Sequence, residues 1–215
     1  MIRTEQAILD DLLERIPRLS ACAGAVRAAL ELSADCFARG GRLFTCGNGG
    51  SAADADHVAG ELLKSFRIGR PIEASDRQAL SSALGPEAAP FFERLQRALP
   101  AIPLSGQSAF ASAYANDVDP EFVFAQHLYA LGRRGDLLWA FSTSGESKNV
   151  VRAAQLAKAL GIGVVAFTGS GGGWLAALAG AAIRVPETET YRVQELHLPA
   201  YHALCAMLEL RFFGT

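Results

Sequence analysis

Short apolar segments that alternate with helical patterns restrict the fold of this chain more than any other feature. The clearest are residues 136–141 and 163–167, which read DLLWAF and GVVAF, and shorter ones occupy residues 42–46, 101–104 and 181–185. Strands that are apolar on both faces are typical of a parallel sheet with helices on both sides. The sequence therefore predicts an α/β fold.

Helical patterns fill the intervals between these segments, and two of them precede the first predicted strand. The predicted helices cover residues 8–16, 26–37, 51–66, 150–160, 174–178 and 192–212. Pro199 lies inside the last of these and can kink it, because proline cannot donate a backbone hydrogen bond.

Residues 67–100 interrupt the alternation and contain four of the nine prolines. Short helical patterns nevertheless occur over residues 77–84 and 91–99. We interpret about 68–100 as an insertion on the surface of a single domain spanning residues 1–215, and such an insertion can form a lid.

Composition argues against several classes of function. The 215 residues carry a formal net charge of −2, which does not favour nucleic acid or an anionic membrane as a partner. No apolar run approaches the roughly 20 residues of a membrane span, and the N-terminus does not resemble a signal peptide, so we expect a cytoplasmic protein. The four cysteines form no CxxC pair and are expected to be buried thiols in a reducing compartment.

The sequence GNGGS at residues 47–51 joins the first predicted strand to a helix. Glycines allow consecutive backbone N–H groups to converge on an anion at the positive end of the helix. The turn could also serve packing alone, but Asn48 and Ser51 add side-chain hydrogen-bonding groups there. A dinucleotide fingerprint fits poorly, because no acidic residue closes a following strand at the usual distance.

A second polar turn follows the strand at 136–141 and contains Ser142, Thr143, Ser144 and Ser147. An N-cap needs only one hydroxyl, so this set favours a phosphate site at the start of the next helix, to which Lys148 could add charge. A third turn, TGSGGG, follows the strand at 163–167. All three turns lie at the carboxyl ends of predicted parallel strands, where such sheets bind ligands, and they predict one composite site.

His57 and Glu61 are four residues apart on one helical face, a spacing that suits a shared metal ion or proton but also occurs in ordinary solvent-exposed pairs. Gln194 and His202 on the closing helix could complete the site. They are eight residues apart, about 12 Å along a helix, so one straight helix can hardly bring both to one ion. Either the helix is distorted or neighbouring subunits contribute. His197 is a competing candidate, whereas we expect His127 on a helix surface.

Five motifs in order resemble the sugar isomerase (SIS) domain family, most closely its phosphoheptose isomerases. They are GNGGSAADADHVAGE (47–61), NDVDPEF (116–122), GDLLWAFSTSGESKNVVRAA (135–154), VVAFTGSGGG (164–173) and RVPETETYRVQELHLPAYH (184–202). The resemblance spans most of the chain apart from about 68–100. It implies a flavodoxin-like three-layer sandwich with a five-stranded parallel sheet, two N-terminal helices, and a homotetramer with active sites between subunits.

The resemblance also implies roles for individual residues. It implies that a phosphosugar, sedoheptulose 7-phosphate, is isomerised with Glu61 as base and His202 as acid. Zinc would be held by His57, Glu61, Gln194 and His202. Substrate contacts would come from Asn48, Gly49, Gly50, Ser51, Asn116, Asp117, Ser142, Thr143, Ser144, Ser147 and Gln194.

Two departures from the family pattern bear on the identity of the sugar substrate more than on the type of reaction. Tyr191 stands three positions before Gln194, where the isomerases carry an aspartate. The segment at 68–100 could reshape the sugar end of the pocket. Rival interpretations are an isomerase of another phosphosugar, a non-catalytic SIS protein that binds a protein partner, and a sugar-phosphate sensor. Sensors of this fold usually carry a DNA-binding domain, and none fits before Arg42.

Overall fold

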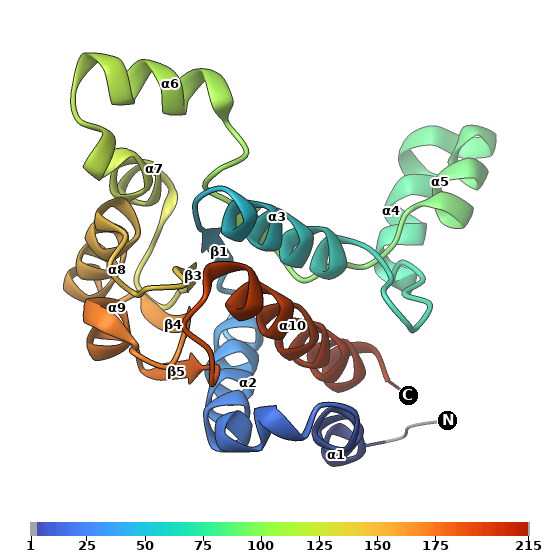
Figure 1. Ribbon diagram of the computed structural model, residues 1–215. Helices are drawn as coiled ribbons and strands as arrows, with labels where there is room; N and C mark the ends of the chain where they lie inside the picture. Colours follow the sequence, from blue (N-terminus) through green and yellow to red (C-terminus); the bar gives the residue numbers. More distant parts are fainter. Residues whose placement is uncertain (1–3, 215) are drawn as a thin grey trace.

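A parallel sheet lies between two layers of helices in the computed structural model, which describes residues 4–214 (Figure 1). Its strands are β1 (Leu43–Cys46), β2 (Ala101–Pro103), β3 (Leu137–Phe141), β4 (Gly163–Thr168) and β5 (Ala181–Arg184). They are all parallel, in the order β2-β1-β3-β4-β5. This is the flavodoxin-like order, and it confirms the predicted α/β fold with five parallel strands.

The helices divide between the two faces of the sheet. One face is covered by α1 (Glu5–Arg15), α2 (Ala23–Ala38), α3 (Gly50–Leu63) and α10 (Thr190–Phe213). The other is covered by α7 (Val123–Leu131), α8 (Lys148–Leu160) and α9 (Gly173–Leu178). Successive residues of β3 enter opposite cores: Leu137 and Trp139 contribute to one, Leu138 to the other. Burial on both faces explains why the strands are continuously apolar.

The structure contains helical turns that the periodicity did not predict. Helix α6 (Ser108–Asp117) and the short 3-10 helix η3 (Pro120–Phe122) precede α7, and η1 (Pro17–Cys22) joins α1 to α2. Helix α6 buries no residue completely, so it lacks the apolar face that would reveal it in a sequence. Helix α10 is continuous from Thr190 to Phe213 although Pro199 lies within it.

His127 corrects one prediction, because it is buried rather than on a helix surface. Its Nδ1 lies 3.1 Å from the carbonyl oxygen of Leu104, and its ring packs near Phe110. The surface prediction is wrong because α6 and the residue after β2 cover the side of α7 that bears His127, a contact between segments distant in sequence.

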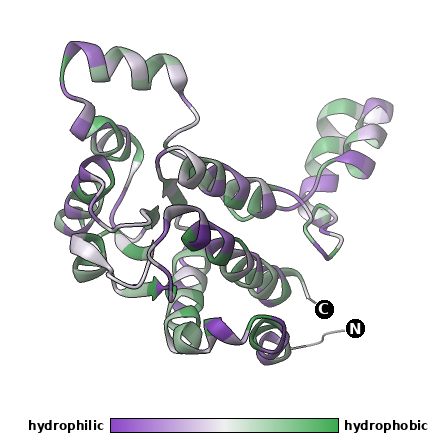
Figure 2. Cartoon of the chain, in the orientation of Figure 1, coloured by the Kyte–Doolittle hydropathy of each residue, from purple (hydrophilic) through white to green (hydrophobic). Residues whose placement is uncertain are grey.

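Residues 68–100 form a hairpin of helices, α4 (Ala74–Leu84), η2 (Gly85–Ala88) and α5 (Ala89–Arg94), that projects from the rest of the chain (Figure 1). Figure 2 shows hydrophilic and hydrophobic residues mixed along it. The helix predicted over 91–99 is wrong beyond Arg94, because Gln96 forms an antiparallel bridge with Pro71. That bridge closes the base of the hairpin. Its role as an inserted lid stays a prediction.

Cys22, Cys36, Cys46 and Cys205 are all free and buried, as expected. Burial raises the pKa of the Cys46 thiol to about 12, which makes it inert. Among residues 4–214, no helix is both long enough and apolar enough to cross a bilayer.

A buried ion pair fixes the chain just after α3. The carboxylate of Glu209, on α10, accepts hydrogen bonds from the backbone N–H groups of Phe66, Arg67 and Ile68 at 2.7–3.1 Å. The guanidinium of Arg70 donates to the same carboxylate at 2.8 Å and to the carbonyl oxygens of two residues in the last turn of α3. These contacts explain why α3 ends at Leu63, earlier than the predicted residue 66.

We expect Glu209→Gln to lower the free energy of unfolding by about 3–5 kcal/mol, because Arg70 would remain buried without its counter-charge. Urea denaturation at fixed protein concentration measures this. Glu195→Gln is the matched control, since Glu195 lies on the exposed side of the same helix. Equal midpoints for the two variants would contradict a stabilising role of the buried pair.

Candidate functional site

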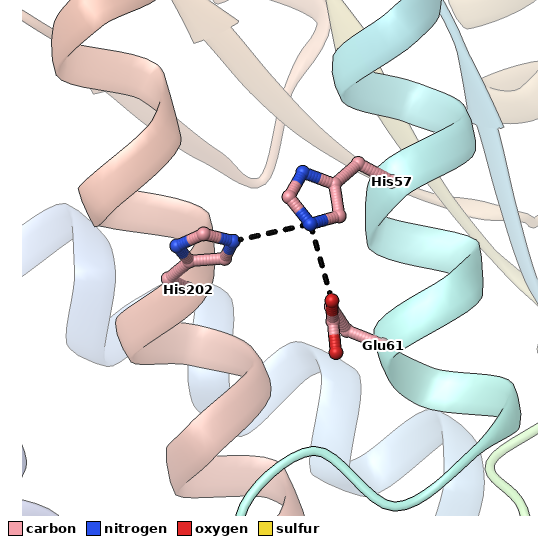
Figure 3. Close-up of side chains that lie close together, drawn as sticks. All are labelled: His57, Glu61 and His202. Atoms are coloured by element: carbon pink, nitrogen blue, oxygen red, sulfur yellow. Dashed lines mark hydrogen bonds and ion pairs between the residues drawn. The ribbon is translucent and has the colours of Figure 1, made fainter.

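Three side chains predicted to act together converge between α3 and α10. Figure 3 shows His57 and Glu61 reaching from one helix and His202 from the other. The Nε2 atom of His57 lies 3.1 Å from Oε1 of Glu61 and 3.5 Å from Nε2 of His202. The three potential ligand atoms all lie within 4.8 Å of one another. The i,i+4 spacing on α3 and the side-by-side packing of the two helices together create this cluster.

The cluster has the dimensions of a divalent metal site. A zinc ion with ligands at about 2.0–2.1 Å in tetrahedral geometry separates its ligand atoms by about 3.4 Å. The separations of 3.1 and 3.5 Å are close to that value. Two imidazoles and a carboxylate are also ligands that zinc prefers. These residues therefore fit such an ion.

Charged and polar neighbours hold the cluster. Glu61 is buried, and each of its carboxylate oxygens has a partner: the ammonium of Lys64 donates to Oε2 at 3.0 Å, and Nε2 of His57 lies 3.1 Å from Oε1. Burial, with a smaller contribution from His57, lowers the pKa of His202 and so favours its neutral imidazole. A neutral imidazole can bind a metal ion or exchange a proton.

Sequence reasoning missed Lys64 and two further neighbours, Asp54 and Tyr201. The hydroxyl of Tyr201 lies 3.0 Å from Nδ1 of His57 and 3.2 Å from Oδ1 of Asp54. Asp54 is three residues before His57, so its position on the same helical face was available from spacing. The contact of Tyr201 with His57 could not be predicted from spacing, because it depends on how α10 packs on α3.

The glycine turn, residues 47–51, lies at the carboxyl end of β1 and leads into α3. Gly49 has a φ of +54°, a conformation that favours glycine. Ser51 is buried, whereas Asn48 is exposed and exchanges two amide hydrogen bonds with Asn149 at 2.8 and 2.9 Å. This pair links the glycine turn to α8. Helix α8 directly follows the turn that contains Ser142, Thr143, Ser144 and Ser147, which we call the hydroxyl-rich turn. The two turns are therefore neighbours, as their positions after β1 and β3 predicted.

Some hydroxyl groups of the hydroxyl-rich turn form hydrogen bonds within the turn, and others are accessible to a ligand. Ser142 is buried, and its Oγ donates to Oγ of Ser147 at 3.0 Å while accepting from the backbone N–H of Gly145 at 3.1 Å. Its hydrogen is thus already used within the turn. Ser144 is exposed and Thr143 is half-buried. Oγ of Ser144 accepts from the backbone N–H of Glu146 at 3.1 Å, which leaves its hydrogen available to donate to a ligand.

Gln194 lies at the glycine turn rather than in the cluster. A Cβ atom on Gly50 would come within 2.7 Å of Nε2 of Gln194, so the absence of a side chain at Gly50 makes room for this amide. Gly50 precedes His57 by seven residues, about 10 Å along a helix. The role of Gln194 as a metal ligand stays a prediction.

Asn116 and Asp117 occupy the last turn of α6, where they are exposed and hydrogen-bonded to each other at 2.9 Å. No hydrogen bond joins either side chain to another part of the described chain. Lys148 pairs with Glu121 at 2.6 Å instead of facing solvent alone. The contacts of Asn116 and Asp117 with a substrate stay predictions.

His197, the competing ligand candidate, lies apart from the cluster. It is fully buried against the sheet, with Nε2 at 3.3 Å from the carbonyl oxygen of Thr168 and the ring near Phe141 and Phe167. Burial lowers its pKa from the ordinary 6.5 to about 4. His197 is a neutral core residue.

The SIS domain family matches residues 9–79 and 74–169. A phosphoheptose isomerase of Desulfovibrio desulfuricans is 39% identical over 86% of this chain and 75% of its own length. One from Shewanella frigidimarina is 34% identical over 98% of this chain and 95% of its own. This chain belongs to the phosphoheptose isomerase family of SIS domain proteins.

Solved structures agree with this family membership. A phosphoheptose isomerase from Neisseria gonorrhoeae superposes with a TM-score of 0.70 at 30% identity, over 94% of this chain and 91% of its own. One from Francisella tularensis gives a TM-score of 0.73 at 29% identity, over 90% of each chain. The resemblance drawn from five sequence motifs is thus confirmed at the level of family and fold.

For this family member we expect His197 to make folding sensitive to acid. Its pKa is about 4 when folded and 6.5 in the unfolded chain, so below about pH 6.5 the unfolded state binds an additional proton and stability falls. The loss between about pH 8 and about pH 5 should be about 2 kcal/mol. Urea denaturation at both pH values should show a smaller loss in His197→Gln. An equal loss in wild type and variant would contradict this source.

We expect Ser144→Ala to weaken binding of inorganic phosphate about 10–100-fold, because one hydrogen bond to a charged ligand contributes about 1.5–3 kcal/mol. Isothermal titration calorimetry measures the dissociation constant. Ser112→Ala is the control, since Ser112 is exposed on α6 and bonds only to its own helix. Unchanged phosphate affinity in Ser144→Ala would show that this hydroxyl does not face the ligand.

Proposed function

We propose that this chain is an aldose-ketose isomerase that converts sedoheptulose 7-phosphate to D-glycero-D-manno-heptose 7-phosphate through an enediol. The observation that carries the proposal is the cluster of His57, Glu61 and His202 in a chain whose phosphoheptose isomerase relatives match it over nearly its full length. The hydroxyl-rich turn supplies hydrogen-bond donors for the phosphate.

In this proposal Glu61 is the base. Its carboxylate removes a proton from C1 of the ketose, the C–H electron pair forms the C1–C2 double bond, and the carbonyl electron pair moves to the C2 oxygen, which is protonated. The C1 hydroxyl of the enediol then gives up its proton as C1 becomes the aldehyde carbon, and the double-bond electron pair takes the proton from Glu61 at C2. The contacts of Glu61 with Lys64 and His57 hold both oxygens in place. His202 donates to the substrate oxygen on which negative charge develops, a role that its neutral imidazole can perform with one N–H group.

We propose Zn²⁺ as the cofactor, held by His57, Glu61 and His202. Their mutual separations support this assignment, as does their chemistry. A bound zinc ion would polarise the substrate carbonyl and orient its oxygens. Gln194 is proposed as a further ligand, for which it would have to come from another subunit.

The distance between the two halves of the site supports a homo-oligomer with shared active sites. Glu61 is eleven residues beyond Gly50, about 16 Å along α3 from the glycine turn. The hydroxyl-rich turn and Gln194 lie near that turn, at the far end from the cluster. We therefore propose that the phosphate turn and Gln194 of one subunit act with the cluster of a neighbour, as in the tetramer that the resemblance implies.

We expect Glu61→Gln to reduce kcat with sedoheptulose 7-phosphate by about 10²–10⁴-fold, because the amide cannot accept the proton. Turnover is measured by product formation with and without added zinc, and His202→Gln tests the acid. Glu93→Gln is the control, since Glu93 is exposed on α5.

Three outcomes would change the proposal. Turnover of another phosphosugar but not of the heptose would reassign the substrate, for which Tyr191 is the first residue to test. No turnover of any phosphosugar would favour a non-catalytic SIS protein. Full activity in protein that metal analysis finds zinc-free would remove the metal role.

A further inference from the structure

Tyr201 connects the two helices of the site at a point that the proposed chemistry does not use. Its ring is fully buried on α10 and lies edge-on to Phe141, with centroids 6.1 Å apart and planes at 89°. Its hydroxyl reaches across to α3, where it contacts both Nδ1 of His57 at 3.0 Å and Oδ1 of Asp54 at 3.2 Å. The core fixes the ring, so the hydroxyl has little freedom to move.

The direction of these hydrogen bonds follows from the number of hydrogens. A tyrosine hydroxyl has one hydrogen to donate, and a carboxylate can only accept. The hydroxyl of Tyr201 therefore donates to Asp54 and must accept from His57. His57 can donate there only when its Nδ1 carries the proton.

In the neutral imidazole, which is the form that can bind a metal ion, a proton on Nδ1 leaves the lone pair of His57 on Nε2. This nitrogen faces Oε1 of Glu61 at 3.1 Å and Nε2 of His202 at 3.5 Å, with no hydrogen of its own to share. A lone pair and a carboxylate oxygen at 3.1 Å repel each other unless a cation lies between them. The hydrogen-bond chain from Asp54 thus prepares the cluster for a cation.

We propose that Tyr201, supported by Asp54, is a positioning residue that holds His57 as its Nδ1–H tautomer and so directs Nε2 toward the metal ion. Partners beyond the ligands commonly fix histidine tautomers in metal sites, and their loss typically costs 10–100-fold in metal affinity. This inference rests on the metal-binding role proposed above. It assigns a task to two residues outside the predicted ligand set.

Asp54 is suited to this task by its surroundings. It lies one helical turn before His57, and its second oxygen, Oδ2, is buried without a hydrogen-bond partner among the described residues. Tyr201 is therefore the group that satisfies this carboxylate. Without Asp54, the hydroxyl would be free to turn its hydrogen toward His57 and reverse the tautomer.

The first test reads the tautomer directly in the zinc-free full-length protein at about pH 8, where an ordinary imidazole is neutral. Long-range ¹H–¹⁵N spectra distinguish protonated from unprotonated ring nitrogens, and His57 is assigned by its loss in His57→Gln. We expect the Nδ1–H tautomer in wild type and a shift toward Nε2–H in Tyr201→Phe, which keeps the buried ring and removes only the hydroxyl. An unchanged tautomer in Tyr201→Phe would overturn the proposal.

The second test measures zinc affinity by competition with a chromophoric chelator. We expect Tyr201→Phe to bind zinc about 10–100-fold more weakly than wild type. Tyr129→Phe should bind like wild type, because Tyr129 is 63% exposed on α7, which covers the other face of the sheet. Equal zinc affinity in Tyr201→Phe and wild type would overturn the proposal.

Asp54→Ala guards against a folding defect in Tyr201→Phe, because it leaves Tyr201 itself unchanged. It should also weaken zinc binding and shift the tautomer, and wild-type behaviour of this variant would contradict the part assigned to Asp54. If wild-type protein binds no zinc, the metal role in the proposed function fails. The tautomer measurement still decides whether Tyr201 positions His57.

Discussion

Helices α3 and α10 pack side by side in the same direction, and the candidate site depends on this packing. Their contacts follow one register: Gly50 meets Gln194 near the start, His57 meets Tyr201 and His202 in the middle, and the chain after α3 meets Glu209 near the end. At the first contact, the missing side chain of Gly50 leaves room for the amide of Gln194, which a Cβ atom would displace. A shift of either helix by one turn would separate His202 from His57.

Stability and chemistry are joined in this pair of helices. Arg70, neutralised by Glu209, donates to the carbonyl oxygens of Glu61 and Leu62, so the buried ion pair caps the turn that carries the proposed base. Buried pairs of this kind contribute little net stability when intact but cost several kcal/mol when one partner is removed. The main effect of the Arg70–Glu209 pair is to position Glu61, because Arg70 holds the last turn of α3, in which Glu61 lies.

The sheet positions the other half of the chemistry. Parallel strands bring the glycine turn after β1 and the hydroxyl-rich turn after β3 to one edge, and the reciprocal amide pair of Asn48 and Asn149 holds them together. The cluster of His57, Glu61 and His202 lies away from that edge. An active site that needs both parts is therefore better built between chains than within one, which accords with the oligomer proposed for this member of the family.

The sequence by itself determined the fold class, because strands buried on both faces must be continuously apolar, and it identified His57, Glu61 and the hydroxyl-rich turn through local spacing. Only the tertiary structure decided which distant groups meet them. It placed His202 beside His57, set Gln194 against Gly50, buried His127 and His197, and brought Tyr201 and Asp54 to the far side of the imidazole. Those outcomes depend on how one helix packs against another, and periodicity within a single segment carries no information about its partner.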